Sequence, residues 1–189
     1  MSTPLNWREI EELCAWISPK IEGLYVDRVI VPERPDFMDG FLKNEWVIRL
    51  HSRDKDHAFL FSTRPRRPYF SLLNGKGPKS ATQGTRAGFD LALGKFLDGR
   101  KVLALDAVER ERTAVLWFTG DDEKVLGLVL TLIPALPEAL LIEAPAKVLK
   151  SNESKLTKFL HSKKLTVLAR SRNVEKQDHF ILPDGSKSP

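Results

Sequence analysis

Eight short apolar segments, each bounded by turn-forming residues, constrain the fold of this chain more than any other feature of its sequence. They are rich in β-branched residues or alternate apolar with polar side chains, which is typical of β-strands. No regular alternation of strand and helix patterns links them, so the order favours antiparallel sheets over βαβ units. The segments cover residues 24–31, 44–51, 58–62, 69–73, 102–108, 113–118, 125–133 and 139–143.

Three helical patterns accompany these strands. Asn6 and Glu9 have the spacing of a capping box at the start of the first helix, which Ser18-Pro19 is expected to end. A second helix is predicted for residues 87–97 and a short third helix for residues 153–161. We therefore predict an α+β fold, an antiparallel β-sandwich flanked by two or three helices.

Three local features give sharper expectations. Cys14 lies on the apolar stripe of the first helix, which predicts a buried structural thiol. Residues 119–122 (Thr-Gly-Asp-Asp) predict a hairpin turn. Gly127 interrupts a strand pattern and predicts a β-bulge.

The length of 189 residues corresponds to one domain, which we place at residues 1–183 with a frayed tail at 184–189. Cys14 is the only cysteine, which excludes an internal disulfide. The first dozen residues do not resemble a signal peptide, and the longest apolar stretch, 125–136, is about half of a membrane span. We expect a cytoplasmic protein with no membrane partner.

The net charge of +5 hides an uneven distribution. Residues 64–101 hold nine lysines and arginines against Asp90 and Asp98, and residues 151–189 have a net charge of +4. The rest of the chain has a net charge of −6. Such segregation predicts a basic face for a polyanionic partner, although a solvated surface explains the charge alone equally well.

Two motifs stand out within this charge pattern. Residues 63–70 (TRPRRPYF) place three arginines, rigidified by two prolines, before Tyr69 and Phe70. Arginine forks bind phosphates and an exposed aromatic ring could stack on a base; in the alternative, one of the rings faces inward on a strand. Residues 108–112 (VERER) place Glu111 beside Arg112 at a turn between two strands.

The sequence offers no convincing catalytic centre. The four histidines lack metal-ligand spacing, and no GxSxG, HExxH or GxGxxG motif is present. GKGPKS, residues 75–80, lacks the context of a phosphate-binding loop, and the paired carboxylates Glu11/Glu12 and Asp121/Asp122 suit solvated positions. We expect no enzyme activity, no metal and no cofactor.

The order of these pieces resembles the NFACT-N domain, the N-terminal domain of the NEMF/RqcH and fibronectin-binding protein A family. The resemblance covers about residues 5–183. Five segments each resemble a family segment: the opening helix and strand, the strand pair with TRPRRPYF, the LALGKFLDGRKV helix with its hairpin, LVLTLIPALPEALLIEAPAKVL and the closing DHFILP. They are residues 5–30, 46–72, 91–118, 128–149 and 178–183.

This resemblance implies a fold similar to the N-terminal domain of formamidopyrimidine-DNA glycosylases. It also implies a non-catalytic role in ribosome-associated quality control, with tRNA and the large ribosomal subunit as partners. The family's Asp-Arg pair, implicated in tRNA handling, corresponds to Glu111-Arg112, while Gly94 replaces a family arginine before Lys95. Family members continue beyond this point of the chain, so an excised or free-standing domain is expected.

The charge pattern and the resemblance together give a set of candidate RNA-binding residues, in which Glu111 is expected to orient Arg112 through a charge-assisted hydrogen bond. Two alternatives remain. One is a DNA-binding glycosylase relative, disfavoured because Pro4 is not N-terminal; the other is a protein-interaction or fibronectin-binding module. The candidate residues are Arg64, Arg66, Arg67, Lys76, Lys79, Arg100, Lys101, Glu111 and Arg112.

Overall fold

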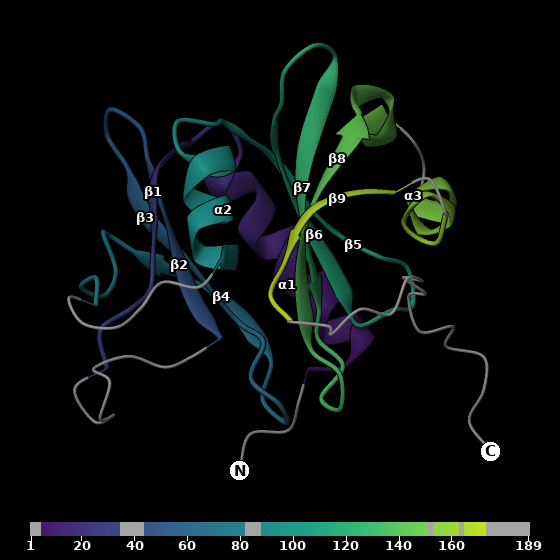
Figure 1. Cartoon of the computed structure of the whole chain (residues 1–189), viewed down its shortest axis with the longest axis horizontal. Helices are drawn as coiled ribbons and strands as arrows, with labels where there is room; N and C mark the ends of the chain where they lie inside the picture. Colours follow the sequence, from purple (N-terminus) through teal and green to yellow (C-terminus); the bar gives the residue numbers. More distant parts are fainter. Residues whose placement is uncertain (1–4, 35–43, 82–87, 151–152, 163–164, 173–189) are drawn as a thin grey trace.

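The computed structural model describes residues 5–34, 44–81, 88–150, 153–162 and 165–172. These residues form two antiparallel sheets with helices around them, as predicted (Figure 1). The first sheet has the order β1-β2-β3-β4 and the second the order β5-β6-β7-β8-β9. The strands are β1 (Tyr25–Ile30), β2 (Glu45–His51), β3 (Asp56–Ser62), β4 (Tyr69–Asn74), β5 (Val102–Ala107), β6 (Thr113–Thr119), β7 (Lys124–Thr131), β8 (Glu138–Pro145) and β9 (Thr166–Arg170).

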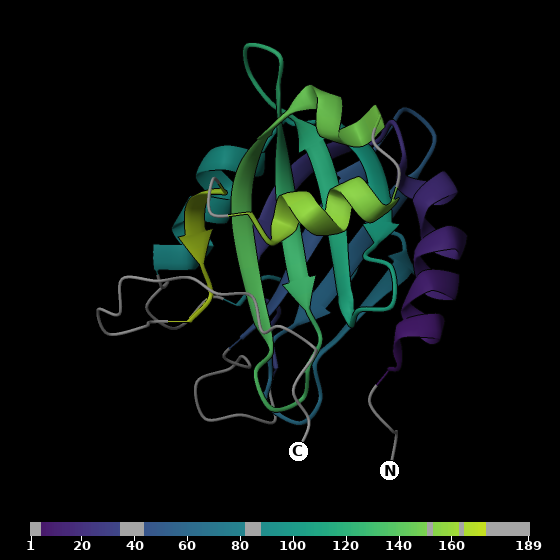
Figure 2. The ribbon, with the colours of Figure 1, turned by 90° about the vertical axis from the view of Figure 1, so that its right-hand side faces the viewer.

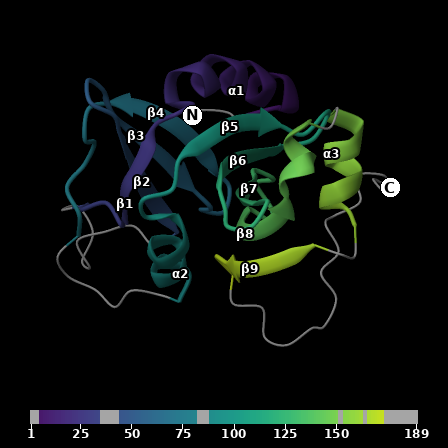
Figure 3. The ribbon, with the colours of Figure 1, turned by 90° about the horizontal axis from the view of Figure 1, so that it is seen from above.

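The main core fills the space between the inner faces of the two sheets. Alternation along β2 and β3 sends Trp46, Ile48 and Phe59 inward, opposite Leu116 of β6 and Leu128 of β7. Helices α1 (Trp7–Ile21) and α2 (Gly88–Leu97) close opposite sides of this sandwich (Figure 3). Each helix buries one apolar face in the same core.

The outer face of the second sheet is covered by the 3-10 helix η1 (Ala146–Lys150) and by α3 (Glu153–Leu160), as Figure 2 shows. Leu156 and Leu160 of α3 pack there against Trp117 and Ile142, which point away from the main core. The short third helix predicted for residues 153–161 is therefore confirmed. Helix η1 and strand β9 are elements that the sequence patterns did not predict.

The outer face of the first sheet is covered by residues 75–81, which we call the strap. The strap crosses so close to the sheet that a Cβ on Gly77 would lie 2.5 Å from the Cβ of Ala58. Gly77 also has a φ of +67°, so glycine is required there for both reasons. The guanidinium of Arg49 donates to the carbonyls of Lys76 and Pro78 at 3.0 and 2.9 Å and fastens the strap.

The start of α1 is predicted correctly and its end is not. The Asn6 side chain accepts from the N–H of Glu9, whose carboxylate accepts from the Asn6 N–H, which is the predicted capping box. The helix continues past Pro19 to Ile21, however. Proline removes only one N–H from the helix, and the extra turn buries Ile21 completely while Glu22 donates to the Ser18 carbonyl.

The bulge predicted at Gly127 is wrong. Strand β7 pairs in regular register with both neighbours there, opposite Trp117 and Ile142. A Cβ on Gly127 would lie 2.7 Å from Cζ3 of the Trp117 ring, so the glycine makes room for the indole. The register shifts lie elsewhere, between Val26 and Arg28, between Val102 and Ala104, and between Leu141 and Ile142. The predicted hairpin at residues 119–122 joins β6 to β7.

Candidate nucleic-acid interface

Three connections meet at one end of the sandwich, which we call the arginine end: residues 63–68, 108–112 and 132–137 (Figure 1, bottom). The main-chain N–H of Arg66 donates to the Pro134 carbonyl at 2.9 Å. The N–H of Leu132 donates to the Arg112 carbonyl at 2.7 Å. Two arginines that are far apart in the sequence are therefore held by the same three-residue segment of the β7–β8 connection.

The charge at this end is mostly positive. The three connections contain five arginines, all in the first two, against Glu109 and Glu111. Arg66 and Arg67 are exposed, and the side chain of Arg110 is 80% exposed. No partner of the Arg112 side chain is found in the described part of the chain. These guanidinium groups are therefore accessible to a ligand.

Arg170 and Arg172 extend this positive region. Arg170 ends β9 and Arg172 lies just beyond it. Ser171 between them exchanges hydrogen bonds with Ala139 and so holds the segment against the start of β8, and Arg170 forms an ion pair with Glu138 at 3.6 Å. Burial raises the pKa of the nearby Glu138, while the two arginines act in the opposite direction. Neither arginine was selected from the sequence, because the 165–170 segment carried no strand prediction that would place it at this end.

The expected pairing of Glu111 with Arg112 is not observed. The Glu111 carboxylate lies 2.7 Å from Nε2 of His161, the residue that follows α3. The contact ties the β5–β6 turn to the outer layer of the second sheet. Sequence reasoning could not find it, because His161 is fifty residues away and has no metal or catalytic spacing to mark it.

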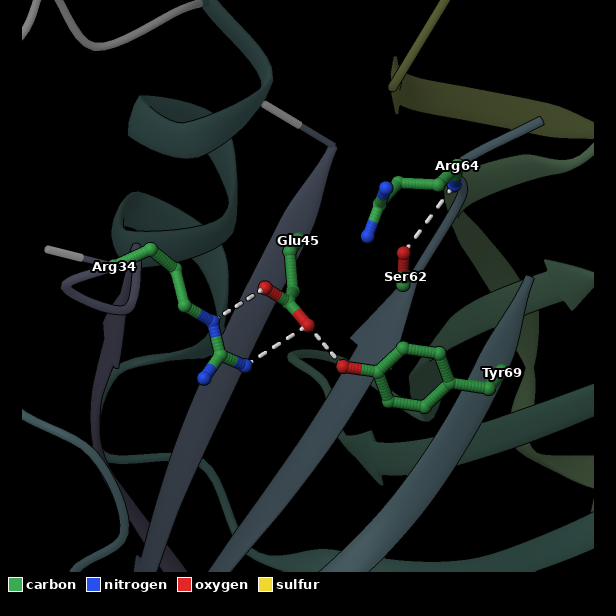
Figure 4. Close-up of polar contacts among 5 residues, drawn as sticks. All are labelled: Arg34, Glu45, Ser62, Arg64 and Tyr69. Carbon is green, nitrogen blue, oxygen red and sulfur yellow. Dashed lines mark hydrogen bonds and ion pairs between the residues drawn. The ribbon is translucent and has the colours of Figure 1, made fainter. Parts of the chain in front are cut away.

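A buried ion pair supports the 63–68 connection from the side of the first sheet (Figure 4). Glu45, at the start of β2, is only 2% exposed and accepts two hydrogen bonds from the Arg34 guanidinium at 3.1 and 3.2 Å. The Tyr69 hydroxyl also donates to Glu45, which fixes the start of β4 immediately after Pro68. Arg64 lies above Tyr69 in the same cluster, with its N–H 3.3 Å from Oγ of Ser62.

Burial and the Glu45 carboxylate shift the pKa values in this cluster. Burial, then the hydrogen bond to Glu45 and its charge, raise the pKa of Tyr69, so the phenol stays a donor. The hydrogen bond to Glu45 raises the pKa of Arg34. Tyr69 is half-buried and Phe70 is 2% exposed. The alternative of an inward-facing ring is therefore correct for Phe70, and neither ring is free to stack on a base.

The other candidate residues lie elsewhere, so the nine do not form one cradle. Lys76 and Lys79 are exposed on the strap, where the Lys79 carbonyl accepts from the Glu33 N–H. Arg100 and Lys101 lie at the opposite end of β6, roughly 20 Å from the arginine end for a strand of this length. The grouping failed because the positive charge of residues 64–101 is spread along strands and connections that reverse direction several times.

Arg100 is also neutralised. Its guanidinium makes two hydrogen bonds to the Asp121 carboxylate at 2.7 and 2.9 Å. This contact raises the pKa of Arg100 and lowers the pKa of Asp121. Arg100 thus fastens α2 to the β6–β7 hairpin and offers little charge to a ligand.

Within the described residues, no three histidine, cysteine, aspartate or glutamate side chains gather as a metal site. No helix among them has the length and apolar composition needed to cross a membrane. Pro4 and the predicted closing segment 178–183 lie outside the described residues, as does the predicted tail.

Comparison with solved structures identifies the fold. The chain is similar to the N-terminal domain of fibronectin-binding protein PavA from Streptococcus pneumoniae, with a TM-score of 0.69 and 14% identity over 97% of this chain and 66% of that one. It is also similar to the N-terminal part of the fibronectin/fibrinogen-binding protein from Streptococcus suis, with a TM-score of 0.66 and 14% identity over 95% of this chain and 58% of that one. A fibrinogen-binding protein from Staphylococcus aureus matches with a TM-score of 0.56 and 12% identity over 73% of this chain and 46% of that one.

The fold is that of fibronectin-binding protein N-terminal domains. This agrees with the fold expected from the resemblance. The chain spans less than two thirds of the length of each of these fibronectin- or fibrinogen-binding proteins. No family model and no curated protein matches the sequence.

Proposed function

We propose that this chain is a non-catalytic RNA-binding domain that binds the phosphate backbone of tRNA or of the large ribosomal subunit through its arginine end. The observation that carries the proposal is the joint anchoring of Arg66 and Arg112 by residues 132–134. Guanidinium groups on fixed main chain lose less freedom on binding than groups on a mobile loop. Arginine forks match phosphate oxygens in geometry and charge.

The proposed interface contains fewer residues than the candidate set. Arg64, Arg66, Arg67 and Arg112 remain, and Arg110 and Arg172 join them, whereas Arg170 forms an ion pair with Glu138. Lys76, Lys79, Arg100 and Lys101 are outside it. Glu111 acts on the interface through the position of the β5–β6 turn rather than through Arg112.

Fluorescence-labelled tRNA titrated at two salt concentrations tests the proposal. Arg66→Gln/Arg112→Gln is expected to weaken binding and to lower the slope of log K against log salt by about 0.7 to 0.9 for each phosphate that is no longer neutralised. Lys76→Gln/Lys101→Gln removes the same charge from exposed positions elsewhere and is the matched control. Equal weakening in the two variants, or binding that does not depend on salt, contradicts the proposed interface.

Two further assays separate the alternatives. Capture on immobilised fibronectin that survives ribonuclease treatment would replace the RNA proposal with a protein-binding module, as the names of the similar structures suggest. Borohydride treatment with abasic DNA is expected to trap no covalent adduct. A trapped adduct would support glycosylase-like chemistry and would contradict the non-catalytic part of the proposal.

A further inference from the structure

A cavity of about 590 Å³ is lined by residues of α1, of the edge strand β5 and of the η1–α3 layer. Its volume is in the range of small-molecule sites. Figure 2 shows how α1 and the η1–α3 layer lie around the second sheet. Trp7, at the start of α1, contributes a partly exposed indole to the wall, whereas Trp117 is only 1% exposed and lies beneath the surface. Leu105, Leu149 and Leu156 line the cavity as well. The cavity therefore offers an apolar and aromatic surface to a ligand.

The polar part of the wall is acidic. Glu11 of α1, Asp106 of β5 and Glu109 of the β5–β6 turn each contribute a carboxylate. The cation among the lining residues is Arg110, which lies 3.8 Å from Glu109 and is 80% exposed in its side chain. An exposed pair of this kind screens little charge inside the cavity. Glu11 has no ion-pair partner within the described residues.

The pKa of Cys14 shows how the carboxylates of the wall act on a neighbouring group. Its thiol lines the cavity and is only 3% exposed. Burial raises the pKa of Cys14 to about 12, with further contributions from Asp106 and Glu11. The carboxylates thus act on a group in the wall in the direction that disfavours negative charge and favours positive charge.

We propose that this cavity binds an organic ammonium ion that carries an apolar body. The ammonium group would lie between Glu11 and Glu109, and the apolar body would pack on the partly exposed side chains of Trp7 and Leu149. Arg110 lies at the edge of both sites. The amine titration does not depend on RNA binding, so either proposal can fail without the other.

Calorimetric titration with three probes of the same shape tests the site: 4-phenylbutylamine, 4-phenylbutan-1-ol and 4-phenylbutyrate. The amine is expected to bind more tightly than the alcohol, and the carboxylate most weakly. Glu11→Gln is expected to reduce the preference for amine over alcohol about fivefold or more, because it removes the attraction between two opposite charges near the surface. Glu12→Gln, on an exposed position of the same helix outside the cavity, is the matched control and should leave the preference unchanged.

Filling the cavity provides a second, charge-neutral test. Ala15 is exposed and lines the cavity, so Ala15→Trp should fold and should weaken all three probes at least tenfold. Circular dichroism and the urea midpoint of each variant check its folding. The proposal is overturned if the amine does not bind at millimolar concentration, if the carboxylate binds as well as the amine, if Glu11→Gln and Glu12→Gln behave alike, or if Ala15→Trp still binds.

Discussion

Replacing Arg34 by methionine tests whether the buried pair with Glu45 holds the base of the arginine end together. Glu45 is 2% exposed and accepts two hydrogen bonds from the Arg34 guanidinium, beside the one from the Tyr69 hydroxyl. Removing one partner of a fully buried ion pair costs about 3 to 5 kcal/mol. The Arg34 side chain is 34% exposed, so water can partly replace it, and we expect a loss of about 2 to 3 kcal/mol.

The double variant Arg34→Met/Glu45→Met tests whether this loss of stability comes from leaving the buried Glu45 carboxylate without its cationic partner. Glu45→Met alone leaves Arg34 and the Tyr69 hydroxyl without their shared acceptor and should cost about 1 to 3 kcal/mol. Replacing both charged partners by apolar side chains is often close to neutral. The double variant still leaves the Tyr69 hydroxyl without its acceptor, so it should be more stable than the sum of the single losses predicts by about 2 kcal/mol rather than by the whole sum.

Urea unfolding at pH 7, followed by circular dichroism, measures all four proteins of this cycle. In thermal unfolding, Arg34→Met should lower the melting temperature by about 4 to 10 °C for a chain of this size. A coupling below about 0.5 kcal/mol would refute the reasoning, because that value is typical of an exposed pair.

Two more predictions concern buried positions, Gly127 and Cys14. Gly127→Ala should cost about 1 to 3 kcal/mol in urea unfolding, because the new Cβ would lie 2.7 Å from the Trp117 ring, whereas Gly88→Ala, with no atom within 4 Å of the new Cβ, should cost nothing. The raised pKa of Cys14, about 12, means that the unfolded chain releases this proton first as the pH rises above about 8.5. The free energy of unfolding of the wild type should then fall by roughly 1.4 kcal/mol per pH unit, while that of Cys14→Ala should not fall for this reason. The difference in unfolding free energy between the two proteins should therefore narrow by about 2 kcal/mol from pH 8 to pH 10. A difference that stays constant would contradict a protonated buried thiol.

The strands were predictable because each carries its own periodicity and turn signals. All eight predicted strand segments match strands β1 to β8 to within a few residues, and the capping box placed the start of α1. Strand β9 was missed because TVLAR is short and its pairing with β8 is non-local. The end of α1 was missed because burial of Ile21 outweighs the local preference of the residue before Pro19.

The candidate site was only partly predictable, and the reason is topological. Arg64, Arg66 and Arg67 are neighbours in sequence, so their grouping needs no fold. Their nearness to Arg112 depends on contact between the β3–β4 connection of the first sheet and the β7–β8 connection of the second sheet, which no local pattern specifies. Arg34 and Glu45 were missed for a related reason: the pair forms across eleven residues, and each partner alone resembles a solvated charge.

Two residues of the arginine end have a backbone conformation that costs free energy. Arg66 and Arg110 both have left-handed φ values, +70° and +57°, in two different connections of that end. Glycine or asparagine adopts this conformation at lower cost, whereas other residues there carry roughly 1 kcal/mol or more of strain. The strain is sustained by the surrounding hydrogen bonds, such as that of the Arg66 N–H to Pro134. The same conformation occurs at Asp122 and Glu123 in the β6–β7 hairpin at the opposite end, so the left-handed φ of Arg66 and Arg110 follows from the tight turns of their connections and assigns no function by itself.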